Sequence, residues 1–99
     1  MVVDSSDDPP FVAVSRRLVA DNMDLSFRQV VTLWDCSVKP RSVTEQAGIL
    51  GVDKPAVTRA ADRLETLGLL ERRDNPKDRR GVLLACTPKG RAFLKRCII

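Results

Sequence analysis

Residues 53–81, DKPAVTRAADRLETLGLLERRDNPKDRRG, join an amphipathic helix to a hairpin that is rich in arginine. At about 100° per residue, the apolar side chains of the first half converge on one side of a helix. These are Val57, Ala60, Ala61, Leu64 and Leu67. Gly68 ends this helix, and two strands at 69–73 and 82–86 flank a turn at 74–81. The stretch therefore predicts a DNA-reading helix that is followed by a wing.

The opposite side of this helix carries side chains suited to base edges and phosphates. They are Pro55, Thr58, Arg59, Asp62, Arg63 and Thr66. Lys54 stands in the first turn, where the helix dipole disfavours a cation by roughly 0.3–1 kcal/mol, and a phosphate at the helix N-terminus would reverse that effect. Five basic residues between Arg72 and Arg80 place cations near the hairpin tip, within reach of phosphates or a narrow minor groove. An inconsequential exposed lysine and a merely solvated loop are the simpler alternatives.

Length and composition predict one soluble domain with a single core, since the chain has 99 residues, 43% hydrophobic and 30% charged. No apolar run approaches the ~18 residues of a membrane span, and the acidic start MVVDSSDDPP is unlike a signal peptide. We expect a disordered acidic N-terminus over 1–8, one domain over 9–99, no membrane association and a cytoplasmic protein.

The net charge of +4 is unevenly distributed along the chain. Residues 1–27 carry −3 and the remainder therefore carries +7. The positive charge lies in the part that contains the helix and the hairpin, which favours a polyanionic partner over a merely solvated basic face.

Three cysteines, Cys36, Cys86 and Cys97, form no CxxC pair, and the chain has no histidine. This pattern argues against a zinc site, and no cofactor is expected. Each cysteine is predicted to be a small buried hydrophobe. The alternative is a redox-sensing Cys36, whose pKa Lys39 and Arg41 would lower.

Four further helices are predicted around the central stretch. The first is capped by Asp8 and extends to about Asn22, with Phe11, Val14 and Leu18 on its apolar stripe. Ser26 and Gln29 form a capping box that opens the second helix, which ends at Lys39 before Pro40. Its predicted buried face consists of Phe27, Val30, Val31, Trp34 and Val38.

The third predicted helix, EQAGIL, is capped by Thr44 and closes at Gly51, only two residues before Asp53 caps the next one. Two helices joined by a tight glycine-containing turn are typical of a helix-turn-helix, whose second helix enters the major groove. Thr87 and Pro88 open a last helix. Its inward side chains are predicted to be Ala92, Phe93 and Cys97.

Over residues 25–94 the chain closely resembles the DNA-binding domain of the MarR family of winged helix-turn-helix regulators. The resemblance rests on three segments, LSFRQVVTLW, TEQAGILGVDKPAVTRAADRLETLGLLERRDNPKDRR and VLLACTPKG. It implies an α+β fold that is mainly α, with a two-stranded β-hairpin wing. It also implies DNA contacts at Lys54, Pro55, Thr58, Arg59, Asp62, Arg63, Lys77, Arg79 and Arg80. Asp78 matches the family's aspartate that braces the wing by pairing with an arginine.

The resemblance has a second implication, for assembly. Family members usually continue into long C-terminal helices that form the dimer, and this chain is expected to be a short member without them. A homodimer through the N- and C-terminal helices, a monomer and a partner protein all remain open. The candidate dimer contacts are Phe11, Val14, Leu18, Phe93, Ile98 and Ile99. The cleft for small phenolic effectors would also be incomplete, which weakens the case for an effector.

The leading functional prediction is a sequence-specific binder of double-stranded DNA that regulates transcription, as a repressor rather than an activator. Helix 54–67 would read the major groove and wing 72–81 the minor groove or phosphates. The alternative is a winged-helix protein–protein adaptor. An enzyme is not expected, because histidine, tyrosine and a glycine-rich phosphate loop are all absent. RNA or single-strand binding lacks a stacking platform if Phe11, Phe27, Trp34 and Phe93 are all in the core.

Overall fold

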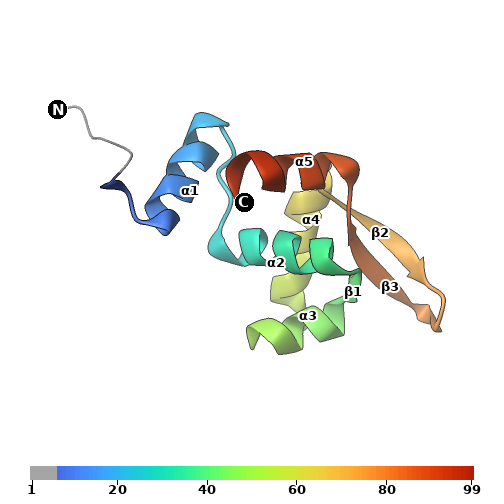
Figure 1. Ribbon diagram of the computed structural model, residues 1–99. Coiled ribbons are helices and arrows are strands. Elements are labelled where there is room, and N and C mark those ends of the chain that lie inside the picture. Colours follow the sequence, from blue (N-terminus) through green and yellow to red (C-terminus); the bar gives the residue numbers. More distant parts are fainter. Residues whose placement is uncertain (1–6) are drawn as a thin grey trace.

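The computed structural model describes residues 7–99. In this range five helices accompany a three-stranded antiparallel sheet, and α1 and the β2–β3 hairpin lie at opposite ends (Figure 1). The elements are α1 (Pro10–Ala20), α2 (Phe27–Val38), β1 (Arg41–Ser42), α3 (Val43–Leu50), α4 (Lys54–Thr66), β2 (Leu70–Asn75), β3 (Asp78–Cys86) and α5 (Pro88–Cys97). The predicted mainly helical winged helix-turn-helix is confirmed. The expected disorder over 1–8 falls mostly outside the described residues.

The ends of α1 differ from the prediction. Pro9 is the N-cap and makes no side-chain cap hydrogen bond. The Asp8 carboxylate instead accepts a hydrogen bond from Arg16 Nε at 2.6 Å, so it is engaged one to two turns along the helix. The helix ends at Ala20, before Asn22 adopts a positive φ of 56°.

The start of α2 was predicted correctly, but its buried face was not. Ser26 Oγ accepts from the Gln29 amide and Gln29 Oε1 accepts from the Ser26 amide, which completes the capping box. The buried residues of α2 are Thr32, Leu33 and Cys36. Of the predicted face, Val30 is half-buried against the core, while Phe27, Val31, Trp34 and Val38 are exposed.

This error has a physical cause. Both sets of residues recur at helical spacing, so α2 has two apolar stripes, and periodicity alone does not say which one meets the larger core. Helix α4 and the sheet pack against the stripe that contains Leu33 and Cys36.

Helix α3 begins two residues earlier than predicted. Its cap is Ser42, whose Oγ accepts from the Glu45 amide at 3.0 Å, while Glu45 Oε1 accepts from the Ser42 amide. Thr44 lies within the first turn and is exposed. Glutamate three residues after Ser42 completes a capping box that Thr44 lacks. Gly51 closes the helix in the left-handed region, with φ of 66°, as predicted.

The sheet has the order β1-β3-β2, and β1 was not predicted. Only Arg41 and Ser42 pair with β3, and two residues are too few to show strand alternation. The hairpin is also longer than predicted, because β2 extends to Asn75 and β3 begins at Asp78. Arg79 and Arg80 therefore lie on β3 and not in a loop.

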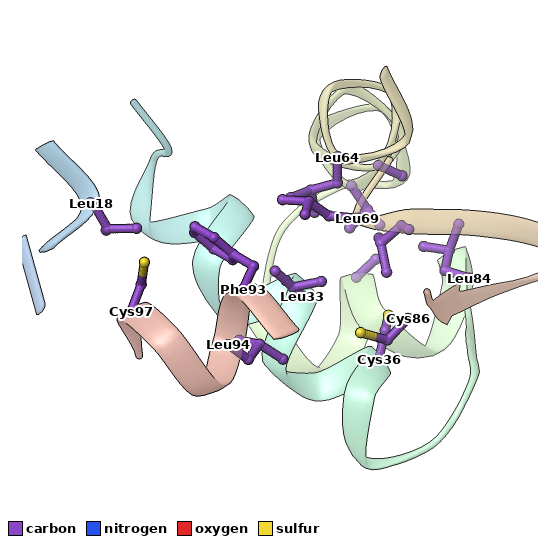
Figure 2. Close-up of a cluster of buried hydrophobic side chains, with 14 residues drawn as sticks. Leu18, Leu33, Cys36, Leu64, Leu69, Leu84, Cys86, Phe93, Leu94 and Cys97 are labelled. Carbon is purple, nitrogen blue, oxygen red and sulfur yellow. The ribbon is translucent and has the colours of Figure 1, made fainter. Parts of the chain in front are cut away.

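The core lies where α2, α4, α5 and the base of the sheet meet. Figure 2 shows Phe93 of α5 beside Leu33 of α2, with Leu64 and Leu69 above them. Phe93 is buried as predicted, whereas Ala92 is exposed and Leu94 takes an inward position instead. All three cysteines are buried with free thiols.

Gly90 fixes how closely α5 approaches the base of the wing. A Cβ at this position would lie 2.3 Å from the Leu69 carbonyl oxygen and 2.8 Å from Cys86 Sγ. Only glycine fits between the first turn of α5 and the start of β2. Within residues 7–99, no helix is both long and apolar enough to cross a membrane.

Candidate nucleic-acid interface

Helix α4 is anchored at its start and buried along one side. Asp53 Oδ1 accepts from the Ala56 amide at 2.8 Å, as a capping residue does. The buried residues are Ala56, Val57, Ala60, Ala61 and Leu64. Four of the five residues in the predicted apolar stripe are buried, and the fifth, Leu67, is half-buried. The small alanines allow α4 to pack closely on its neighbours.

The opposite side of α4 faces solvent. Six predicted contact residues are exposed there: Lys54, Pro55, Thr58, Arg59, Asp62 and Arg63. Lys54 is the first helical residue, at the end where unpaired backbone N–H groups and the helix dipole attract anions. This face therefore offers one row of donors beside a cation at the helix N-terminus.

The wing carries its own exposed cations. Lys77 lies in the two-residue turn between the strands, and Arg79 and Arg80 follow on β3. Asp78 Oδ1 accepts from the backbone amide of Arg80 at 2.9 Å, and no ion pair in the described chain includes Asp78. The predicted pairing with an arginine side chain is therefore wrong. The hydrogen bond of Asp78 is local to β3, and the guanidinium of Arg80 makes no hydrogen bond or ion pair within residues 7–99.

The basic side chains of residues 7–99 divide into two groups. One group is engaged with carboxylates or backbone carbonyl groups: Arg16, Arg17, Arg41, Arg72, Arg73, Lys89, Arg91 and Arg96. The other makes no side-chain hydrogen bond or ion pair within that range. Most of its members lie on α4 or the wing: Lys54, Arg59, Arg63, Lys77, Arg79 and Arg80. Arg28, Lys39 and Lys95 lie elsewhere. The uncompensated positive charge is thus concentrated on the two elements of the predicted interface.

Asp62 differs from its neighbours because it is not free. Its Oδ1 lies 2.6 Å from Nη2 of Arg72, and Glu65 Oε1 lies 2.8 Å from Nη1 of the same residue. Asp62 remains exposed on the predicted face, and its carboxylate is engaged by Arg72 on β2. Sequence reasoning missed this contact. The only sign of this contact in the sequence is a pair of acidic residues three positions apart on a helix, followed by a strand that contains an arginine.

The cysteines do not form a reactive site. Burial raises the pKa of Cys36 to about 12, and the opposing effect of Arg41 is smaller. Burial likewise raises the pKa of Cys86 and of Cys97. Thiols in this state are protonated at neutral pH, whereas a redox-sensing cysteine needs thiolate character and access to solvent. The alternative of a redox-sensing Cys36 is therefore contradicted.

Three of the four aromatic residues are exposed, and the prediction that all four are in the core was wrong. Phe11, Phe27 and Trp34 are 60%, 71% and 43% exposed, and the first two rings meet edge to face with centroids 5.2 Å apart. Phe11 and Phe27 line a groove of about 450 Å³ between α1 and α2. Trp34 lines a second groove, of about 540 Å³, between α2 and α5. The argument that single-strand binding is excluded because all the aromatic residues are buried therefore fails. None of these exposed rings is on α4 or the wing.

A helix packed behind a tight turn, followed by a hairpin with free cations, defines a winged helix-turn-helix protein. The model of the MarR family matches residues 25–82, and the chain belongs to this family. The family comprises regulators rather than enzymes, in agreement with the prediction that the chain is not an enzyme.

Named relatives agree with this assignment. The chain is 37% identical over 78 residues to the multiple antibiotic resistance protein MarR of Escherichia coli, covering 76% of this chain and 53% of that protein. It is 39% identical over 62 residues to the transcriptional repressor MprA of Escherichia coli, covering 63% and 34%. Thus it spans about half and a third of the lengths of these two relatives. The crystal structure of the transcriptional regulator BldR from Sulfolobus solfataricus superposes with a TM-score of 0.74 at 38% identity, covering 85% of this chain and 60% of that one.

Proposed function

We propose that the protein binds double-stranded DNA sequence-specifically in the cytoplasm and regulates transcription, acting as a repressor. The observation that carries this proposal is the concentration of uncompensated cations on α4 and the wing. Cations elsewhere in the described chain are mostly satisfied by carboxylates or carbonyl groups. The unpaired basic side chains of α4 and the wing can bind DNA phosphates, and contacts to phosphates supply a large share of the affinity for DNA.

The two elements would read different grooves. A helix of ordinary diameter fits the major groove, which is about 12 Å wide. Thr58 and Arg59 are the best placed for base edges, and Arg63 for the adjacent backbone. Lys54 would meet a phosphate at the helix N-terminus. Arg80, whose guanidinium is free, would enter the minor groove, where negative potential is strongest at narrow A·T-rich segments.

The repressor assignment is supported by the similarity to MprA, which is a transcriptional repressor. A bound winged helix covers both grooves of its site, and an obstacle at a promoter excludes polymerase without any further contact. A promoter-reporter assay with and without the protein tests the direction: reporter output should fall when the protein is present.

The binding proposal is tested by selecting bound duplexes from a random library and measuring affinity against salt concentration. We expect an enriched site, with log affinity falling against log salt by about 0.9 for each phosphate contacted. Lys95→Ala is a matched control, because it removes an unpaired exposed cation from α5 and not from α4 or the wing. If no site is enriched and the Lys54→Ala and Lys95→Ala variants bind duplex alike, the proposal is wrong.

A homodimer is the second part of the proposal, and the structure narrows the residues that could form it. Leu18 and Phe93 are in the core of the chain, so the prediction that they contact another copy is wrong. Val14 and Ile98 are half-buried against the same core. Phe11 and Ile99 remain exposed. Phe11 shares the first apolar groove with Phe27, and Ile99 shares the second with Trp34, so the exposed apolar surface of these two grooves is suited to another protein.

The symmetry of the selected site distinguishes the possible assemblies. A palindrome indicates a two-fold dimer, because half-site symmetry mirrors protein symmetry. The same apolar surface also favours the alternative of a protein–protein adaptor. That alternative would be supported by a stoichiometric complex with a purified regulator that forms with no affinity for duplex DNA.

A further inference from the structure

Arg72 connects the candidate recognition helix to the wing. Among the ion pairs of residues 7–99, only those of Arg72 join α4 to the hairpin. Its two terminal nitrogens contact different carboxylates, Asp62 at 2.6 Å and Glu65 at 2.8 Å. One guanidinium therefore holds two points of the helix at once.

The geometry of the strand and the helix produces this contact. Alternation along β2 places Arg72 on the same face as Leu70, which is 2% exposed and part of the core. Asp62 and Glu65 are three residues apart and therefore share one side of α4. The Arg72 side chain is 28% exposed, less than either of its partners. It thus lies between the last turns of α4 and the base of the hairpin.

A two-point contact restricts how the wing can turn. The covalent link between α4 and β2 is short, with Gly68 at a positive φ of 76°, and the base of the hairpin is held by the buried Leu70 and Leu84 and by the pairing of β3 with β1. The two ion pairs of Arg72 add a polar contact between this base and α4, and a tilt of the hairpin relative to the helix would stretch them.

We infer that Arg72 is a positioning residue, which sets the angle between α4 and the wing so that both elements engage one duplex. The inference rests on the proposed DNA-binding function. A preset angle reduces the conformational freedom that is lost when two separate contacts form together. The same ion pairs also neutralise two carboxylates that would otherwise repel phosphates beside the helix.

A direct phosphate contact by Arg72 is the competing explanation, and salt dependence separates the two. A residue that neutralises one phosphate contributes about 0.9 to the slope of log affinity against log salt. A positioning residue changes affinity at every salt concentration and leaves that slope as it was. Arg80 is the reference, because its proposed contact depends on where the wing points.

The first experiment is a double-mutant cycle on the selected duplex, with Arg72→Gln, Arg80→Ala and both together. We expect Arg72→Gln to weaken binding about tenfold, the scale of two partly exposed ion pairs, with an unchanged salt slope. In the Arg80→Ala background the same change should have less than about a twofold effect, because residues that act through one another are not additive. A slope reduced by about 0.9, or fully additive losses, would overturn the inference.

The second experiment needs no DNA, so it separates failure of this inference from failure of the proposed function. Residual dipolar couplings and backbone relaxation report the orientation and order of residues 70–86 relative to α4. Arg73→Gln is the matched control, because Arg73 pairs with Glu71 at 2.6 Å within the same strand and does not touch α4. We expect Arg72→Gln to loosen the wing and Arg73→Gln to leave it unchanged. A wing that keeps its orientation and order in a folded Arg72→Gln variant overturns the inference, whether or not the parent binds duplex.

Discussion

The outward faces of α4 and α2 differ, although both helices bury their inner faces in the same core. The outer face of α4 carries Lys54, Arg59 and Arg63, which are exposed and unpaired. The outer face of α2 carries Phe27, Trp34 and Val38, which are exposed and apolar. Desolvating a charged face is unfavourable unless an opposite charge replaces the water, whereas covering an apolar face is favourable in itself. One face is thus suited to a polyanion and the other to a protein surface.

The largest expected effect tests the orientation of α2. Leu33 is fully buried and Val38 is 62% exposed. We expect Leu33→Ala to lower the free energy of unfolding by about 2–5 kcal/mol, through lost burial and the cavity left behind. Val38→Ala should change it by less than about 0.5 kcal/mol. Urea titrations of both variants measure the difference. Equal losses would mean that α2 presents its other apolar stripe to the core.

The next effect tests whether the charged face of α4 reads DNA. Arg59→Ala should cost about 1–3 kcal/mol of binding free energy on the selected duplex and relax its base preference. Arg80→Ala should weaken binding chiefly on sites with a narrow minor groove. Lys95→Ala lowers the net charge by the same amount and should have little effect. Fluorescence anisotropy at fixed salt measures all three. Equal losses of binding free energy in the three variants would mean that α4 contributes only long-range electrostatic attraction and no specific contact.

A third effect belongs to the buried face of α2 and depends on pH. Burial raises the pKa of Cys36 to about 12, so the folded chain holds this proton more tightly than the unfolded chain does. The resulting stabilisation is complete below about pH 8.5, the pKa of a cysteine thiol in the unfolded chain. It is lost as the pH rises towards the pKa of Cys36 in the folded chain. Between about pH 8 and about pH 10 the parent should lose about 1–2 kcal/mol more than Cys36→Ala. Parallel losses in urea titrations would show that Cys36 is not the group responsible.

The sequence predicts α4 well because several local signals agree there. Asp53 marks the start, Gly68 marks the end and one apolar stripe lies between them. Helix α2 also has a clear start and end, but its two apolar stripes are equivalent until α4 and the sheet are in place. Strand β1 is too short to show a pattern, and Arg72 meets Asp62 only after β2 has folded back on α4. What the sequence does not predict is thus decided by tertiary contacts between elements.

The smallest effect concerns the start of α3, which connects α2 to α4 and where two possible caps stand close together. Ser42 Oγ accepts from the Glu45 amide at 3.0 Å, and the Glu45 side chain returns to the Ser42 amide. Ser42→Ala should therefore cost about 1 kcal/mol of stability. Thr44→Ala should leave the stability unchanged or raise it by a few tenths of a kcal/mol, since alanine is the better helix former at an exposed position. Because β1 also includes Ser42, backbone amide exchange at its partner Leu83 shows whether the strand pairing survives. A greater loss from Thr44→Ala than from Ser42→Ala would place the cap two residues later and remove the capping box from α3.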